Sequence, residues 1–349
     1  MLTTIFAFIF VLGLLVFVHE LGHFITAKMV GIRVERFSLG FPPRMIGKKV
    51  GDTDYCISWI PLGGYVKMAG MVDESLEANT IKGEPWEYMS KPVWQRVIVI
   101  SAGSIMNFLT AVAIYSLLFY FVGIGEGLDG TTIGETLPGK PAEAIGMRPG
   151  DTVSAINGQP VKTWEELTTI IHKNPEQEIV IEWQRDGQTF RSAVTPQRQP
   201  EGNIGLIGIG PKIKFRQSGF AESWQAGFTQ SYNILRLTVY ALKLIITGQE
   251  PVKDAIGGPL RIAEEAGKSA KLGFQYLLAF TAVISLNLAF FNMLPFPVLD
   301  GGHMVFLLIE GIRRKPLSTK TTLVVQKIGM AFLLALIVFI FFNDLRRVL

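Results

Sequence analysis

The chain contains four long stretches without a single Asp, Glu, Lys or Arg residue, at 1–18, 97–125, 272–299 and 328–343. Each is close to or above the roughly 20 apolar residues that cross the hydrocarbon core of a bilayer as a helix. We therefore expect four transmembrane helices, at 1–27, 97–125, 272–299 and around 328–343. The first stretch has no basic start and no small-residue cleavage site, so we expect it to stay in the protein as a span.

Between the second and third stretches, the pattern changes to short β-type segments separated by Gly, Pro and Asn turns. Asp186-Gly187 supplies a two-residue hairpin turn between two such segments. Thr163 and Glu166 form a capping-box pattern, which predicts a short helix among the strands. We expect a compact β-rich domain at residues 127–212.

Residues 213–271 contain an ambiguous apolar stretch at 224–246. Five polar residues interrupt it: Gln225, Gln230, Asn233, Arg236 and Lys243. We expect an amphipathic helix on the outer membrane interface rather than a fifth span. A fifth span would carry the basic residues of the following loop to the outer side, which the charge rule disfavours.

Composition and charge agree with a membrane protein and set its orientation. The 349 residues are 49% hydrophobic and 18% charged, which is more apolar than a typical soluble domain. The predicted loop 28–96 holds ten Lys or Arg residues, and the loop 300–327 holds five. Because short loops rich in Lys and Arg stay cytoplasmic, both termini and the 127–212 domain should lie outside. The net charge of +4, without a basic patch interleaved with aromatic residues, gives no indication of nucleic-acid binding.

The first predicted span ends in His19-Glu20-Leu21-Gly22-His23, a motif of the form H-E-x-x-H. Residues four apart share one face of a helix, so both imidazoles can bind one zinc ion while Glu20 acts as general base for the attacking water. Ionisable residues within a span are costly and usually functional. The alternative is a pair of interfacial histidines that bind lipid headgroups or backbone carbonyls.

A catalytic zinc site typically has three protein ligands, so one must come from another segment. Asp300 borders the third charge-free stretch, where a carboxylate needs a cation as partner. Pro295 and Pro297 prevent a regular helix just before it and should turn its carboxylate inward. His303, three residues further on, is the alternative third ligand. Since the first and third spans should run in the same direction, the two motifs should meet at one depth.

Two further groups of residues are candidates for holding a substrate. Asn287 and Asn292 lie in the third span, where they either hold the backbone of an unwound substrate or form interhelical hydrogen bonds. An alternating run ends at Trp59, ahead of a turn that includes Gly63 and Gly64. A helical substrate must unwind before cleavage and then needs hydrogen-bond partners, as an added strand does. This segment is therefore either an edge strand for substrate or an ordinary interfacial hairpin.

Three more stretches accompany the H-E-x-x-H motif: V-E-R-F-S-L-G-F at 34–41, I-P-L-G-G-Y-V-K-M at 60–68 and N-x-x-P-x-P-x-L-D-G at 292–301. Together they resemble the site-2 protease family of intramembrane zinc metalloproteases, most closely its bacterial regulator-of-sigma-E type. The resemblance covers nearly the whole chain.

The resemblance implies a bacterial inner-membrane protease that cuts single-span membrane proteins, typically an anti-sigma factor or a remnant signal peptide. An upstream site-1 protease would first trim the outer domain of the substrate. By match of motif, His19, His23 and Asp300 would bind Zn²⁺, and Glu20 would be the catalytic base. The domain at 127–212 would be a periplasmic PDZ-like domain that filters substrates by size.

The chain departs from the family pattern in two places. It has room for one PDZ domain where the best-known relatives carry two, and Gly40-Phe41-Pro42 replaces a frequent Gly-Phe-Gly. A membrane-anchored PDZ adaptor or quality-control scaffold without peptidase activity is an alternative function, but it leaves the intact Glu20 unexplained. A zincin of another family, cutting loops outside the bilayer, would need a Glu ligand on a soluble helix that we do not find downstream.

Overall fold

The computed structural model describes residues 2–71, 81–127, 130–199, 204–249 and 257–348. Parts of the predicted segments 28–96, 127–212 and 213–271 therefore lie outside the described residues. The chain divides into two compact units. We call them the helical unit (Met1–Phe119 and Gly219–Leu349) and the β unit (Tyr120–Ser218).

Four helices in the described part of the chain are long and apolar enough to cross a membrane. They are α1 (Leu2–Met29), α2 (Val93–Phe121), α8 (Phe274–Asn292) and most of α10 (Thr319–Val348). The prediction of four long apolar helices is confirmed. α10 begins ahead of its charge-free stretch because the Lys side chains of its first turns can extend their charged ends to polar surroundings.

The directions of α1 and α8 follow from two contacts. The Phe10 ring lies 6.5 Å from the ring of Phe274 at the start of α8. His19 contacts Asn292, the last residue of α8, at 3.4 Å between Nε2 and Nδ2. The earlier residue of α1 contacts the start of α8 and the later residue contacts its end. The two helices therefore run in the same direction, as the sequence predicted. α2 runs the opposite way between them.

The segment after α1 forms one long bent hairpin of β1 (Val34–Val50) and β2 (Thr53–Met68), which leads to the short 3₁₀ helix η1 (Tyr88–Ser90). The first part of β1 pairs on one side with 54–57 and on the other side with 64–68. Residues 54–57 also pair with 46–49, so this part of β2 is occupied on both edges. The expectation of an edge strand is therefore wrong for residues 54–57 of the run that ends at Trp59.

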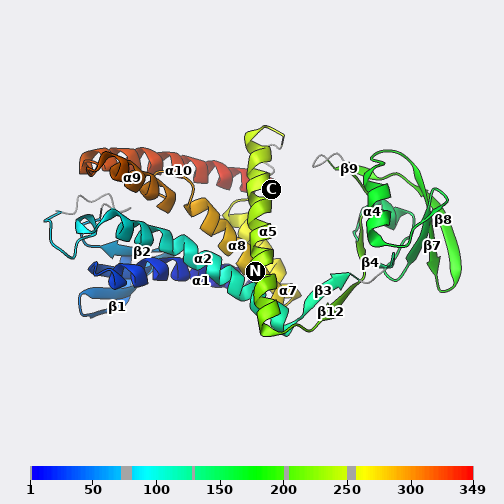
Figure 1. The fold of residues 1–349 in the computed structure, drawn as a ribbon, viewed down its shortest axis with the longest axis horizontal. Helices are drawn as coiled ribbons and strands as arrows, with labels where there is room; N and C mark the ends of the chain where they lie inside the picture. Colours follow the sequence, from blue (N-terminus) through cyan, green and yellow to red (C-terminus); the bar gives the residue numbers. More distant parts are fainter. Residues whose placement is uncertain (1, 72–80, 128–129, 200–203, 250–256, 349) are drawn as a thin grey trace. The chain divides into compact units, whose positions relative to one another are not determined.

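The remaining helices of the helical unit are α5 (Phe220–Ile246), α7 (Pro259–Leu272) and α9 (Asp300–Arg313). α5 runs across the four long helices (Figure 1) and is not apolar enough to count among the candidate spans. Its buried residues are mostly small, whereas Trp224, Phe228 and Tyr232 are exposed. This distribution is typical of a helix that rests on the bundle and turns large apolar side chains to lipid. Its interfacial position stays a prediction.

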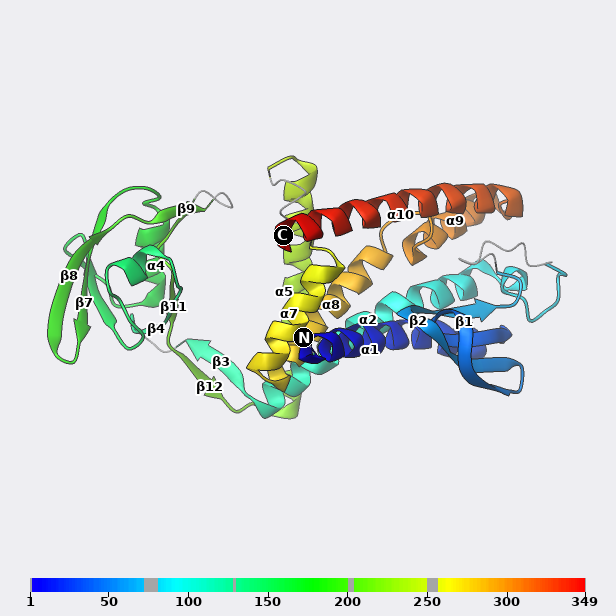
Figure 2. The same cartoon turned by 180° about the vertical axis from the view of Figure 1, so that it is seen from behind.

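The β unit has its own core around a four-stranded antiparallel sheet. Its strands lie in the order β6 (Gln159–Pro160), β5 (Thr152–Ile156), β7 (Ile179–Arg185) and β8 (Gln188–Val194). Figures 1 and 2 show the helix α4 (Trp164–His172) beside this sheet. The capping box of Thr163 and Glu166 is confirmed at the start of α4. The hairpin turn is confirmed as well, with φ of 49° at Asp186 and 79° at Gly187.

The elements of the β unit in chain order are β3 (Ile124–Gly127), β4 (Ile133–Thr136), α3 (Pro141–Ala144), β5 (Thr152–Ile156), β6 (Gln159–Pro160), α4 (Trp164–His172), β7 (Ile179–Arg185), β8 (Gln188–Val194), β9 (Gln197–Gln199), β10 (Ile204–Leu206), β11 (Ile209–Pro211) and β12 (Ile213–Arg216). β3 pairs with β12, so the chain enters and leaves the unit along one two-stranded ribbon.

Candidate metal centre

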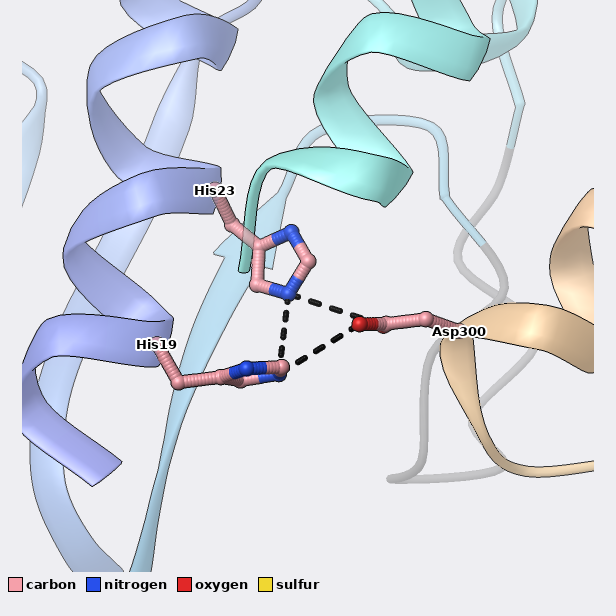
Figure 3. Close-up of side chains that lie close together, drawn as sticks. All are labelled: His19, His23 and Asp300. Carbon is pink, nitrogen blue, oxygen red and sulfur yellow. Dashed lines mark hydrogen bonds and ion pairs between the residues drawn. The ribbon is translucent and has the colours of Figure 1, made fainter. Parts of the chain in front are cut away.

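Three side chains from two distant parts of the sequence converge inside the helical unit. Figure 3 shows His19 and His23 on α1 and Asp300 at the start of α9 pointing toward one another. The two Nε2 atoms are 3.2 Å apart. Asp300 places Oδ2 at 3.4 Å from Nε2 of His19 and Oδ1 at 3.5 Å from Nε2 of His23.

The spacing of these three groups fits a zinc ion. Ligands at about 2.0–2.2 Å from a tetrahedral zinc lie about 3.3–3.6 Å from one another. The three separations, 3.2, 3.4 and 3.5 Å, are close to this value. Two imidazoles and one carboxylate are also a ligand set of catalytic zinc, which leaves a fourth position for water or substrate. His303 is not a member of the group of potential ligands that the structure brings together.

His23 is oriented by the backbone of α2. Its Nδ1 lies 2.8 Å from the carbonyl oxygen of Val99, a distance at which Nδ1–H donates a hydrogen bond. A histidine that donates through Nδ1 keeps the lone pair of Nε2 available to a metal. The contact therefore fixes both the tautomer and the direction of the ring.

α1 and α2 approach closely because glycines lie where the helices meet. A Cβ atom at Gly22 would come within 2.5 Å of the carbonyl oxygen of Ala102. A Cβ atom at Gly103 would come within 2.4 Å of Nε2 of His23 and 2.6 Å of Cε1 of His19. Any side chain at position 103 would occupy the place of the imidazoles. Both imidazole rings therefore pack directly against α2 at Gly103.

Asp300 reaches the histidines from the end of an irregular loop. α8 ends at Asn292 and α9 begins at Asp300, so the predicted break in the helix around Pro295 and Pro297 is confirmed. The loop folds back on α9 so tightly that a Cβ atom at Gly301 or Gly302 would lie 2.1–2.2 Å from a loop carbonyl oxygen. Only glycine fits at these two positions, which follow the aspartate directly. Ser104 of α2 donates to Oδ2 of Asp300 at 3.3 Å.

A cavity of about 290 Å³ opens next to the three side chains. Glu20 lines it together with the three potential ligands, and so do residues 65–68 of β2. A Cβ atom at Gly64 would lie 3.1 Å from Cγ of Glu20, so the absence of a side chain lets β2 pass beside this carboxylate. The other lining residues are Arg36, Phe41, Pro42, Met71, Ile100, Val298 and His303.

The predicted substrate residues lie in different places. Asn292 contacts Nε2 of His19 at 3.4 Å. Asn287 does not line the cavity and accepts a hydrogen bond from Thr238 of α5 at 3.1 Å, which is the interhelical bond given as its alternative. Trp59 is 65% exposed and is not among the lining residues. Gly63 packs against the ring of Phe41 rather than against the metal group.

The sequence pattern did not predict any contribution of α2, which consists of the carbonyl group of Val99, Gly103, Ser104 and Asn107. Asn107 has a local signal, because it is a polar residue in the middle of a charge-free stretch. The pattern also did not predict Gln326, which is 2% exposed on α10 and contacts Nε2 of His303 at 3.3 Å.

A buried ion pair fixes α9 relative to α2. The guanidinium group of Arg96 donates to both carboxylate oxygens of Glu310 on α9. Arg96 is 4% exposed, and it also lies over the ring of Tyr88. Arg96 is one helical turn from Val99, and Glu310 belongs to the helix that begins at Asp300. The pair therefore ties together the two helices that bring Asp300 to the histidines.

The chain is similar to known proteins over nearly its whole length. Residues 7–336 match Peptidase family M50. The chain is 30% identical to the regulator of sigma-W protease RasP of Bacillus subtilis, with 99% of this chain and 98% of that protein covered. It is 31% identical to the zinc metalloprotease RasP of Geobacillus kaustophilus, again with 99% and 98% covered.

Among solved structures, the chain is similar to the PDZ domain of an SdrC-like protein of Listeria monocytogenes. The identity is 21%, the match covers 25% of this chain and 93% of that one, and the TM-score is 0.22. We draw no conclusion about the β unit from a likeness of this size. The family match and the two full-length relatives, by contrast, leave no ambiguity: the chain belongs to peptidase family M50 and is a multi-pass membrane zinc metalloprotease.

Proposed function

We propose that the protein is an endopeptidase that cuts single-span membrane proteins within the bilayer. The observation that carries the proposal is the group of His19, His23 and Asp300, spaced as zinc ligands beside Glu20. The two histidines lie on the candidate span α1, and Asp300 follows the candidate span α8 at the start of α9. If the reactive groups of a peptidase lie within the membrane, its substrate must present a membrane-embedded segment to them. Membership in peptidase family M50 supports the reaction class.

The proposed roles follow from the geometry. His19, His23 and Asp300 would hold Zn²⁺, which supplies a Lewis acid that polarises the peptide carbonyl group and lowers the pKa of water. Glu20 lines the same cavity and would take the proton of the attacking water, then pass it to the leaving amine.

The substrate would bind as an added strand along residues 65–68 of β2. This segment lines the cavity, and among the strands the structure describes only β1 pairs with it. An extended segment placed there would find backbone partners for the amides that unwinding sets free. Asn292, which contacts His19, would hold the substrate backbone at the metal. The strand that would pair with substrate is therefore the one after Gly64, and not the run that ends at Trp59, as the sequence suggested.

The family resemblance supports a proposal for the substrates and for the role of the β unit. We propose that substrates are anti-sigma factors or remnant signal peptides, trimmed beforehand by a site-1 protease. The β unit would be a PDZ-like domain on the periplasmic face of the inner membrane, where it excludes substrates with bulky outer domains. The RasP of Bacillus subtilis, a regulator of sigma-W protease by name, supports the anti-sigma class.

The test uses the purified protein in detergent with a panel of single-span substrates, each in two forms, trimmed or with its folded outer domain. We expect cleavage of the trimmed forms, loss of cleavage with a zinc chelator and return of cleavage with added zinc. Glu20→Gln should retain zinc and lower the cleavage rate on the order of 10²-fold or more, since an amide cannot accept the proton.

Retained cleavage by Glu20→Gln within a few-fold would remove Glu20 from the role of base. Cleavage that survives full zinc removal would contradict the proposed reaction. Equal cleavage of trimmed and untrimmed forms would refute the size filter and leave the peptidase assignment intact.

A further inference from the structure

α2 carries none of the potential zinc ligands, yet it contacts each of them. The carbonyl group of Val99 orients His23, and Ser104 donates to Asp300. The third contact joins Asn107 to His19, with Nδ2 at 3.3 Å from Nδ1. Val99, Gly103 and Asn107 are four residues apart, so they form one stripe along the helix.

Asn107 is an unusual residue in this stripe. It is 1% exposed, and its Oδ1 is buried without a hydrogen-bond partner. A buried amide oxygen that lacks a donor is unfavourable, and such groups are rare in folded proteins. The backbone of Asn107 is itself held from α8, because Ser285 donates to its carbonyl oxygen at 2.7 Å. The backbone that carries this side chain is therefore tied to α8.

In the other orientation of the amide group, the ring of His19 can supply a donor to this oxygen. The two ends of an amide group have the same shape, so turning the amide over exchanges Oδ1 and Nδ2 without moving any neighbour. Oδ1 then lies about where Nδ2 lies now, within reach of Nδ1–H of His19. This is the tautomer that leaves Nε2, the atom directed at His23 and Asp300, with a free lone pair.

We propose that Asn107 is a positioning residue for the metal centre: its side-chain oxygen accepts the Nδ1 hydrogen of His19 and holds Nε2 toward the metal. Val99 does the same for His23 through its backbone carbonyl group. The inference rests on the proposed zinc ligands. Partners of this kind typically contribute 10- to 100-fold to metal affinity.

The test compares zinc affinity in variants of the full-length protein in detergent, by competition with a chromophoric chelator. Asn107→Leu keeps the approximate volume and removes the acceptor, and we expect zinc binding about 10- to 100-fold weaker. Asn107→Asp keeps an oxygen for Nδ1–H and should stay within a few-fold of wild type. Ser116→Ala is the matched control, because Ser116 is buried on the same helix and bonds only to the backbone of its own helix at Val112.

Thermal unfolding of each zinc-free variant separates positioning from stability. Weaker zinc binding in Asn107→Leu that Asn107→Asp restores, at equal zinc-free stability, supports the proposal. Unchanged affinity in Asn107→Leu, or an equal loss in Asn107→Asp, overturns it. If Asn107→Leu does not fold, Asn107→Ala serves in its place with the same two outcomes. His19→Ala tests the proposed zinc ligands separately. If zinc affinity in this variant equals that of wild type, His19 is not a ligand and the proposed set of ligands is wrong.

Discussion

The two units each enclose an aspartate, but they surround it in opposite ways. In the β unit, Asp151 is 1% exposed and receives two contacts of 2.7 Å from Arg185 and one of 2.8 Å from the amide of Arg148. In the helical unit, Asp300 faces two imidazole nitrogens at 3.4 and 3.5 Å and one hydroxyl group at 3.3 Å. The first carboxylate has strong fixed donors, and the second is surrounded by longer and weaker contacts.

The protonation behaviour of Asp151 agrees with a structural role. Burial by itself raises the pKa of Asp151, but the hydrogen bonds and charge of Arg185 and the amide of Arg148 more than offset it. The pKa therefore lies below its ordinary value. The difference between the two sites teaches that the donors around a buried carboxylate indicate its role. Asp151 is satisfied by fixed protein donors, whereas Asp300 converges with lone pairs of histidine, as expected of a cation site.

The largest expected effect is on zinc in Asp300→Asn. The amide keeps the shape of the side chain but removes the charge and a strong ligand, so zinc affinity should fall by about 100-fold or more, beyond the loss expected for an outer partner. Metal content after dialysis, with activity on the same samples, measures it.

His303→Ala is the comparison variant for that experiment. His303 lines the cavity but lies outside the group of potential ligands, so its removal should leave metal content largely intact. The opposite ranking of the two variants would transfer the ligand role to His303. It would also remove the contrast between Asp300 and Asp151.

An intermediate effect is expected for Gly103→Ala. The new methyl group would lie 2.4 Å from Nε2 of His23, so the imidazoles must move away from their present positions. A displacement on the order of 1 Å at a catalytic group can cost about 10²-fold in rate. Gly13→Ala on α1 is the matched control, because nothing lies within 4 Å of its added Cβ. Equal activity of the two variants would show that α2 does not shape the centre.

The smallest effect on the metal, and the largest on the β unit, is expected for Asp151→Asn. Loss of the charge-assisted bonds to Arg185 should destabilise the β unit by about 1–3 kcal/mol. Zinc content should not change, since the proposed zinc ligands all belong to the other unit. Hydrogen exchange of the β7 amides in the full-length protein reports the change in stability.

The stability of the β unit at acidic pH is a second measurement of the role of Asp151. Because the folded pKa of Asp151 is depressed, its contribution to stability is present above the unfolded value of about 3.9. It is lost as the pH falls through the lower folded pKa. Wild type should therefore lose stability of the β unit in that window, and Asp151→Asn should lose less. Identical acid profiles would mean that the Arg185 pair contributes little.

Local patterns predicted much of the fold. Charge-free stretches predicted the four long helices, and the capping box at Thr163 and the hairpin turn at Asp186 were both found in place. The pairing of β2 was not predictable from alternation, because alternation gives a strand but not its neighbours. The bent hairpin places 54–57 inside and 65–68 at the cavity only through the long-range register of β1.

The sequence by itself determined the candidate zinc ligands, since H-E-x-x-H places His19 and His23 on one face of any helix and either Asp300 or His303 follows the proline-broken span. The structure groups Asp300, and not His303, with the two histidines. Only the tertiary structure decided how those residues are held. Gly103, Ser104 and Asn107 matter because α2 lies against the imidazoles, and the bonds of Arg96 to Glu310 and of Gln326 to His303 join segments far apart in the chain. Periodicity reports the environment of a residue along its own helix, but the identity of the neighbour across the interface depends on how whole helices pack.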